Sequence, residues 1–174
     1  IVYLAGETDG DLGGGGETGG RVGFVARWDR RTGLDWVEPV LAATSIADLA
    51  VGSTDYGPHV VGVANIDGRP TQYAAKYDSA GRRSWAGNDP RPPGSCHAVA
   101  RGPDGRAFAV CDLESETDQP RAIVRRFPLG GPTTTIYEMD DAGASSAVDV
   151  AVDPEGGDVF IAGFAESGLG AADT

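Results

Sequence analysis

Runs of consecutive apolar residues recur along the chain, separated by segments rich in glycine, proline and aspartate. Ala107–Cys111 and Val159–Gly163 are apolar or small at successive positions, whereas a strand with one face in water would alternate apolar and polar residues. No window of about ten residues places apolar side chains at helical spacing. The pattern predicts an all-β protein whose short strands are covered on both faces.

Tight turns with recognisable chemistry separate these runs. Residues 102–105 read GPDG and residues 153–157 read DPEGG. In both turns proline supplies the φ of about −65° that an early turn position needs, and glycine supplies a positive φ. We therefore expect antiparallel hairpins across both turns.

Three sequence elements recur with a period of about 50 residues, which is typical of repeat architectures. The first element begins with serine and ends in alanine, and its copies are Ser45–Ala50, Ser95–Ala100 and Ser146–Ala151. The second is an apolar strand that ends in glycine or cysteine, and its copies are Tyr3–Gly6, His59–Gly62, Phe108–Cys111 and Phe160–Gly163. The third precedes a glycine turn and an aromatic residue, and its copies are Phe24–Asp29, Tyr73–Asp78 and Ile123–Pro128.

One repeat unit thus contains four strands in about 50 residues, which is typical of a β-propeller blade. The chain, 1–174, is then a single partial β-propeller. It holds the last three strands of one blade (1–40), two full blades (41–89 and 90–140) and the first half of another (141–174), or about three and a half blades in all. Since propellers typically have at least about four blades, we expect further blades or further copies of the chain to complete the ring.

Composition and charge narrow the range of partners. The chain has 27 glycines and 11 prolines, which suits short strands joined by turns, and its formal net charge is −12. An acidic protein repels nucleic-acid phosphates and anionic membrane surfaces, and no apolar run approaches the roughly 20 residues of a membrane span. We expect no nucleic-acid partner and no membrane insertion. No signal peptide is visible, and the chain begins at Ile1, which indicates a processed product, an excised fragment or part of a longer protein.

The repeat resembles a family of secreted bacterial β-propeller repeats of the seven-bladed type. The resemblance covers essentially the whole chain and rests on Val2–Thr8, Phe24–Asp29 with Trp36, Ala151–Asp153 and Val159–Gly163. It implies an extracellular, periplasmic or cell-surface bacterial protein in which the propeller serves as a noncatalytic module for protein interaction or scaffolding. It implies no shared catalytic residue, and we expect the chain not to be an enzyme.

Kelch propellers also repeat at about 50 residues and are the second family that the chain resembles. Kelch blades carry a Gly-Gly doublet at the end of the second strand, whereas this chain has single glycines, or a cysteine, at that place. These residues are Gly6, Gly62, Gly163 and Cys111. The departure makes the kelch assignment the weaker of the two.

The segment DGDLGGGG, residues 9–16, raises the question of a ligand loop. A phosphate-binding loop would need lysine at the entry of a helix, and neither follows here. Asp9 and Asp11 have the alternating spacing with which oxygen-ligand calcium loops begin, although position 12 of such a loop is Gly20 rather than Glu. The interpretation we favour is a loop that joins the second and third strands, with no cofactor, and calcium bound by Asp9 and Asp11 is the alternative.

The two histidines, His59 and His97, fall in predicted strands of different blades, without the three or four clustered ligands of a zinc site. A Ser-His-Asp triad is compatible with the residue types, but no Gly-x-Ser-x-Gly elbow occurs. The serines at 45, 95 and 146 recur with the repeat, which favours a structural role at the strand start. We therefore predict no catalytic residue.

Cys96 and Cys111 lie on the two strands of one predicted hairpin. A two-residue turn at Pro103-Asp104 would place them directly opposite, which permits a disulfide. A type I turn with a glycine bulge, which this sequence favours, shifts the register by one and sends the side chains to opposite faces. This argument favours two unpaired, buried thiols.

Two further sets of charged residues recur with the repeat. Arginine pairs stand at 30–31, 82–83 and 125–126; we expect a solvated rim there, with an interface to acidic loops of another copy as the alternative. Asp48 and Asp149 occupy equivalent first-strand positions, and Ala98 replaces them in the middle blade. If both carboxylates faced a central channel, the chain would bind or hydrolyse glycans, which is the alternative to a noncatalytic interaction module.

Overall fold

The computed structural model describes residues 1–10, 21–40, 45–52, 57–89, 93–114, 119–127, 134–138 and 143–166. Within these ranges every regular element is a β-strand, and no helix is long and apolar enough to cross a membrane. The strands form four antiparallel sheets in chain order.

The first sheet contains β1 (Val2–Thr8), β2 (Val22–Asp29) and β3 (Gly33–Val40). The second contains β4 (Ser45–Ala50), β5 (His59–Ile66), β6 (Arg69–Tyr77) and β7 (Arg83–Asp89). The third contains β8 (Gly94–Arg101), β9 (Ala107–Leu113), β10 (Arg121–Phe127) and β11 (Thr134–Glu138). The fourth contains β12 (Ser145–Val152) and β13 (Val159–Ala165). The prediction of an all-β chain with four-stranded antiparallel sheets is confirmed.

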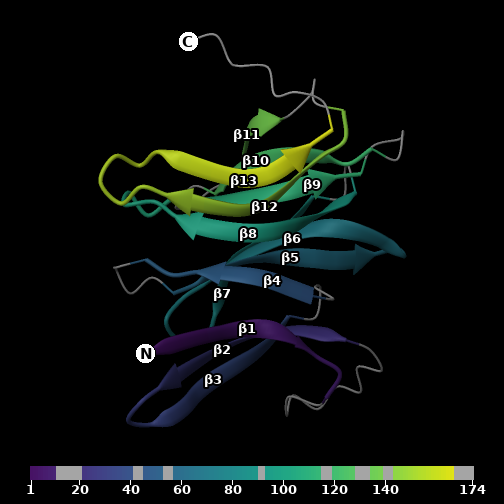
Figure 1. Cartoon of the computed structure of the whole chain (residues 1–174). Helices are drawn as coiled ribbons and strands as arrows, with labels where there is room; N and C mark the ends of the chain where they lie inside the picture. The colour runs from purple at the N-terminus through teal and green to yellow at the C-terminus, as the bar shows by residue number, and fades with distance from the viewer. Residues whose placement is uncertain are drawn as a thin grey trace.

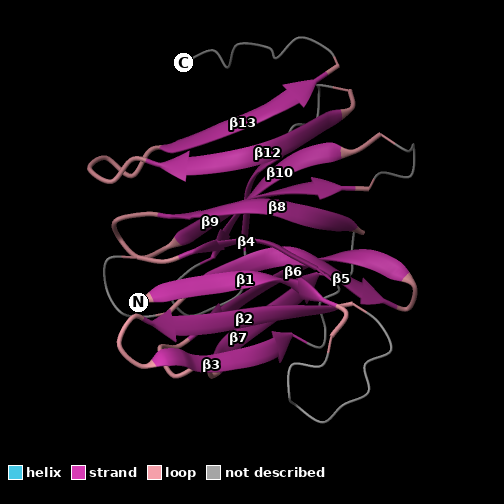
Figure 2. Cartoon of the chain, turned by 60° about the horizontal axis from the view of Figure 1, so that its bottom comes forward, coloured by secondary structure: helices cyan, strands magenta, loops and turns pink. Residues whose placement is uncertain are grey.

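The sheets stack face to face, with the first and fourth at opposite ends of the stack (Figure 1). Figure 2 shows that strands make up most of the described chain and are joined by turns and loops. Three apolar layers fill the spaces between the sheets, which explains the unbroken apolar runs of the sequence. Representative residues are Val25 and Tyr73 in the first layer, Val61 and Ile123 in the second, and Val124 and Val150 in the third.

A β-bulge interrupts the first strand of the second, third and fourth sheets at the same place. Ala47, His97 and Val148 each lack a residue paired with them on the neighbouring strand, and the strand register shifts by one across them. A bulge bends its strand and re-aims the neighbouring side chains. The same distortion is therefore built into every repeat whose first strand is described.

The bulge brings the first strand unusually close to the second. A Cβ added to Gly62 would overlap the carbonyl oxygen of Ser45, and one added to Gly163 would overlap that of Ser146. Glycine in a strand interior is unfavourable unless another backbone approaches it closely. Here the approach of the bulged strand explains why the second strand has glycine at this interior position.

The third sheet has Cys111 at this position, and Cys111 forms a disulfide with Cys96, with an S–S distance of 2.06 Å and Cα atoms 3.9 Å apart. The expectation of two free thiols is wrong. The turn itself is as predicted, because Gly105 has a φ of 82° and Ala98 pairs with Val110, one residue out of the disulfide register. The second bulge, at His97, shifts the register back by one and places the two cysteines opposite each other.

The expected arginine rim also needs correction at one position. Arg82 is exposed and pairs with Asp78 at 2.9 Å, but Arg125 is only 8% exposed. Alternation along β10 places Arg125 on the same face as Ile123 and Phe127, which pack towards the second sheet. Arg125 is thus part of the interior between two sheets.

The bulge geometry predicts unequal effects of the same substitution at two equivalent glycines. Gly62→Ala should destabilise the chain by about 1–3 kcal/mol, because its methyl group meets backbone that has to shift. The matched control, Gly6→Ala, should have little effect, since the nearest side-chain atoms lie 3.4 Å from the added Cβ. Urea unfolding of both variants measures the difference, and equal losses would contradict the close approach at Gly62.

Candidate functional site

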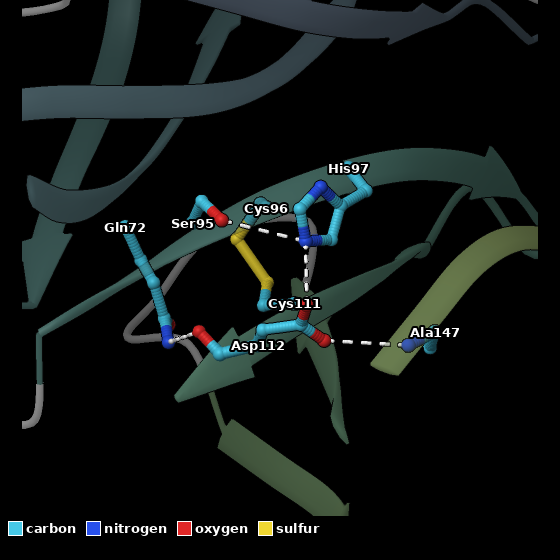
Figure 3. Close-up of a disulfide and its surroundings, with 7 residues drawn as sticks. All are labelled: Gln72, Ser95, Cys96, His97, Cys111, Asp112 and Ala147. Atoms are coloured by element: carbon cyan, nitrogen blue, oxygen red, sulfur yellow. Dashed lines mark hydrogen bonds and ion pairs between the residues drawn. A yellow bond between two sulfur atoms is a disulfide. The ribbon is translucent and has the colours of Figure 1, made fainter. Parts of the chain in front are cut away.

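A group of polar side chains lies beside the disulfide, where β8 begins and β9 ends (Figure 3). His97 stands at the bulge of β8, and Asp112 directly follows Cys111 on β9. The disulfide links the residues next to each, so it fixes the spacing between the two side chains. Both side chains are partly buried, with exposed fractions of 35% for His97 and 16% for Asp112.

Asp112 joins the third sheet to both of its neighbours, and we refer to its contacts as the Asp112 clamp. Its Oδ2 accepts hydrogen bonds from the Ser146 hydroxyl at 2.6 Å and pairs with His97 Nε2 at 2.9 Å. Its Oδ1 accepts from the Ala147 amide of the fourth sheet at 3.3 Å. Its backbone carbonyl accepts from the Gln72 side chain of the second sheet at 3.3 Å.

The clamp favours the charged form of His97. The hydrogen bond to Asp112 raises the pKa of His97 above its usual value, burial lowers it, and the negative charge of Asp112 adds to the rise. A protonated imidazole next to a carboxylate forms a charge-assisted hydrogen bond, which is shorter and stronger than a neutral one. The contact between His97 and Asp112 is therefore stronger at pH values below the raised pKa of His97, where the imidazole is protonated.

The clamp does not have the geometry of a catalytic triad. In a triad the imidazole contacts the serine through one ring nitrogen and the carboxylate through the other. Here Ser95 Oγ, at 3.4 Å, and Asp112 Oδ2, at 2.9 Å, both face Nε2 of His97. This cluster therefore orders two sheets and does not provide a relay to activate Ser95.

A second carboxylate links the second and third sheets. Oδ2 of Asp48 accepts a hydrogen bond from the Val99 amide of the third sheet at 2.9 Å, and its Oδ1 accepts from Leu49 at 2.8 Å. The equivalent Asp149 is exposed and accepts, through Oδ1, from Val150 at 2.8 Å. Asp48 thus has a structural role, and Asp149 is in the same position with no further sheet described beyond it.

Of the two residues proposed for calcium, Asp9 alone lies within the described chain. Asp9 is exposed just beyond the end of β1, and Asp11 lies outside the described residues. Within the described ranges, no three His, Cys, Asp or Glu side chains form a group that would hold a metal ion. Calcium binding at Asp9 and Asp11 stays a prediction.

The sequence contained a signal for the clamp that the repeat pattern obscured. Positions equivalent to His97 hold Ala47 and Val148, whereas positions equivalent to Asp112 hold Glu7, Val63 and Phe164. His97 is therefore a polar residue where the other described bulges hold apolar ones, which points to a role specific to its repeat. Ser146 was interpreted as a strand-start residue, and its hydroxyl does hold the start of β12.

Comparison of the chain with protein-family models and with curated proteins found no match.

The clamp predicts a pH-dependent contribution of His97 to stability. Because the pKa of His97 is raised in the folded chain, its contribution is fully present below the unfolded value of about 6.5 and is lost as the pH rises through the raised pKa. Wild type should therefore exceed His97→Gln in stability by more at about pH 5.5 than at about pH 8.5. The difference should stay below about 1 kcal/mol, because a third of the side chain is in water.

Urea unfolding of both proteins at the two pH values measures this difference. Ser95→Ala is the control and should keep the wild-type pH dependence, since Asp112 remains in place. A gap between wild type and His97→Gln that does not change with pH would show that the pair with Asp112 adds no charge-dependent stability.

Proposed function

We propose that the chain is a noncatalytic extracellular β-propeller module that assembles with protein partners by adding matching β-strands and sheets at its two open ends. The partner that fits best is another unit of the same repeat, from a further copy of the chain or from further blades. The proposal is supported by the face-to-face stacking of repeat sheets and, above all, by the environment of Gly6.

Gly6 is equivalent to Gly62 and Gly163, but its surroundings are different. The latter two lie against a bulged first strand, whereas β1 is an edge strand and no first strand pairs with it among the described residues. The nearest neighbour of a Cβ at Gly6 is the Phe24 ring, at 3.4 Å. Within the described chain, no close backbone approach requires glycine at this position. The glycine is explained if a bulged first strand from elsewhere docks on the free edge of β1.

The other end of the stack is open in a complementary way. The fourth sheet exposes Phe160, Phe164 and Val148, with exposed fractions of 61%, 60% and 57%. Among the described strands, β13 pairs with β12 on one side and with none on the other. Apolar side chains beside an unpaired strand edge are a site for association. Asp149 lies on the same sheet and matches Asp48, whose Oδ2 binds the amide of the following sheet. A backbone amide of a following sheet would donate the same hydrogen bond to Asp149.

The disulfide supports an extracellular, periplasmic or cell-surface location. Disulfides form and persist in oxidising compartments, and they are rare in the cytosol of mesophilic organisms. The Cys96–Cys111 bond joins two adjacent strands deep in the third sheet, where both residues are buried. This fits the location that the resemblance to secreted propeller repeats implies.

The free edge of β1 predicts a selective effect of one methyl group on assembly. A peptide with the first-strand sequence of residues 45–52 should bind the chain, and the chain should self-associate with increasing concentration. Gly6→Ala should fold normally but weaken both processes at least about tenfold, because the methyl group occupies the space of the bulged strand. Fluorescence anisotropy of the labelled peptide and sedimentation equilibrium measure the two effects.

The control variant is Gly10→Ala, which lies beyond the end of β1 and should bind the peptide as wild type does. A chain that stays monomeric at high concentration and does not bind the peptide would overturn the assembly proposal. Binding that is the same in Gly6→Ala and in wild type would place the contact elsewhere than on the edge of β1.

A further inference from the structure

The disulfide stands at a place where the neighbouring repeats have no cysteine. In each sheet with a described bulge, one residue of the first strand directly faces one residue of the second strand beside the bulge. The facing pairs are Ile46 and Gly62, Cys96 and Cys111, and Ala147 and Gly163. In the second and fourth sheets glycine admits the close approach of the bulged strand, so this approach does not need a disulfide. The cysteine pair therefore points to a role specific to the third sheet.

The covalent bond allows two side chains to fit between strands that lie this close. The Cα atoms of Cys96 and Cys111 are 3.9 Å apart, which is less than the ~4.5 Å of the closer facing pairs in antiparallel sheets. In the fourth sheet, a Cβ at Gly163 would overlap the Ser146 carbonyl oxygen and lie 3.0 Å from Cα of Ala147. Two unbonded thiols have to keep van der Waals separation, so they need more room between the strands than the bonded pair does.

The surroundings favour a movement of the strand over a rotation of the thiols. Cys96 and Cys111 are both buried in the second apolar layer, together with Val61, Leu113 and Ile123. Protein interiors are close-packed, and extra volume inside them shifts the backbone. Among the described strands, β8 lies at the edge of the third sheet, whereas β9 is held between two strands. The start of β8 is therefore the part that should move.

The start of β8 also carries one half of the Asp112 clamp. His97 and Asp112 directly follow the two cysteines along β8 and β9, and His97 Nε2 lies 2.9 Å from Asp112 Oδ2 (Figure 3). The same carboxylate accepts hydrogen bonds from the Ser146 hydroxyl and the Ala147 amide of the fourth sheet. Because β12 packs on both β8 and β9, a change in the spacing of these two strands reaches the fourth sheet directly.

We propose that Cys96 and Cys111 form a redox switch that controls how firmly the fourth sheet is held on the third. In the oxidised chain the disulfide holds β8 against β9, so that His97 pairs with Asp112 and β12 is fixed. In the reduced chain the start of β8 moves away from β9, His97 leaves Asp112, and β12 and β13 are held loosely. This inference goes beyond the proposed assembly and does not rest on it.

The reductant is a dithiol, either a small molecule or a protein. One of its thiolates attacks a sulfur of the disulfide, the S–S bond breaks, and a mixed disulfide forms. The second thiol of the reductant then closes the reductant's own disulfide and releases the chain. Two electrons and two protons pass to Cys96 and Cys111, which both end as thiols. Since both residues are buried, the attack requires local opening at the start of β8.

The test compares the oxidised chain with the chain in excess dithiothreitol, and a thiol count after denaturation establishes each state. The chain has two histidines, His59 and His97, so an NMR titration resolves the His97 imidazole. Reduction should lower the pKa of His97, because the hydrogen bond to Asp112 is what raises it. Amides of β12 should exchange with deuterium at least about tenfold faster after reduction, whereas amides of β2 in the first sheet should not change.

Two double variants separate a switch from a simple cross-link. Cys96→Ala with Cys111→Gly rebuilds the facing pair of the fourth sheet, Ala147 and Gly163. It should keep the clamp without a disulfide and should not respond to dithiothreitol. Cys96→Ser with Cys111→Ser keeps two unbonded side-chain atoms between the strands, so it should resemble the reduced chain in the pKa of His97 and in the exchange of β12.

The outcomes separate the alternatives. The same pKa of His97 and the same β12 exchange in the oxidised and reduced chains would overturn the proposal. Loss of the clamp in the Cys96→Ala, Cys111→Gly variant would show that the disulfide acts only as a cross-link, which would overturn it as well. Faster exchange of β2 together with β12 on reduction would show a general loss of structure and would also contradict a switch. If a double variant fails to fold, the comparison of the oxidised and reduced wild-type chain still decides the question.

Discussion

The β-bulge in each first strand is the constraint on which the rest of the structure depends. It stands at Ala47, His97 and Val148, and it brings the first strand against the second so closely that two of the facing residues are glycine. In the third sheet the same bulge restores the register that the hairpin turn had shifted, which lets Cys96 and Cys111 bond. One local distortion thus accounts for the glycines, for the disulfide and for the position of His97.

Apolar layers hold the sheets together, and a few polar contacts set how each sheet lies on the next. The hydrophobic effect has no preferred direction. A carboxylate that accepts a hydrogen bond from a backbone amide, in contrast, fixes one strand of a sheet relative to a particular residue of the next sheet. Asp48 does this between the second and third sheets, and Asp112 between the third and fourth. Between the first and second sheets, Arg27 and Trp36 both donate to the carbonyl of Ser79, at 3.1 and 3.0 Å. At the ends of the stack, Asp149 is equivalent to Asp48 and Gly6 is equivalent to Gly62, and these equivalences are the basis of the proposed assembly.

The sequence predicts the strands and their grouping into antiparallel sheets because both depend on local patterns that recur. Apolar runs, glycine turns and a period of about 50 residues are visible without knowledge of distant contacts. The partners of particular side chains are not visible in this way. The free-thiol prediction failed because a bulge at His97 leaves no signature in a single strand, and Arg125 was assigned to the surface because its burial depends on the face of β10 that it occupies.

The repeat pattern draws attention to the first-strand serines and to Asp48 and Asp149, whereas His97 of the Asp112 clamp departs from the repeat. Asp48, considered as a channel carboxylate, has both oxygens engaged by backbone amides. In a repeat protein the shared positions mostly build the unit, and the exceptions deserve the first functional hypothesis.

Hydrogen–deuterium exchange of the β1 amides, followed over a range of chain concentrations, tests the central claim most directly. If a first strand from another unit docks on the free edge of β1, amides of Val2–Thr8 that exchange readily in the dilute chain should become protected as the concentration rises. Amides of β9, which lies between two strands of its own sheet, should be protected throughout and serve as the internal reference. Exchange of β1 that is fast and independent of concentration would contradict the account.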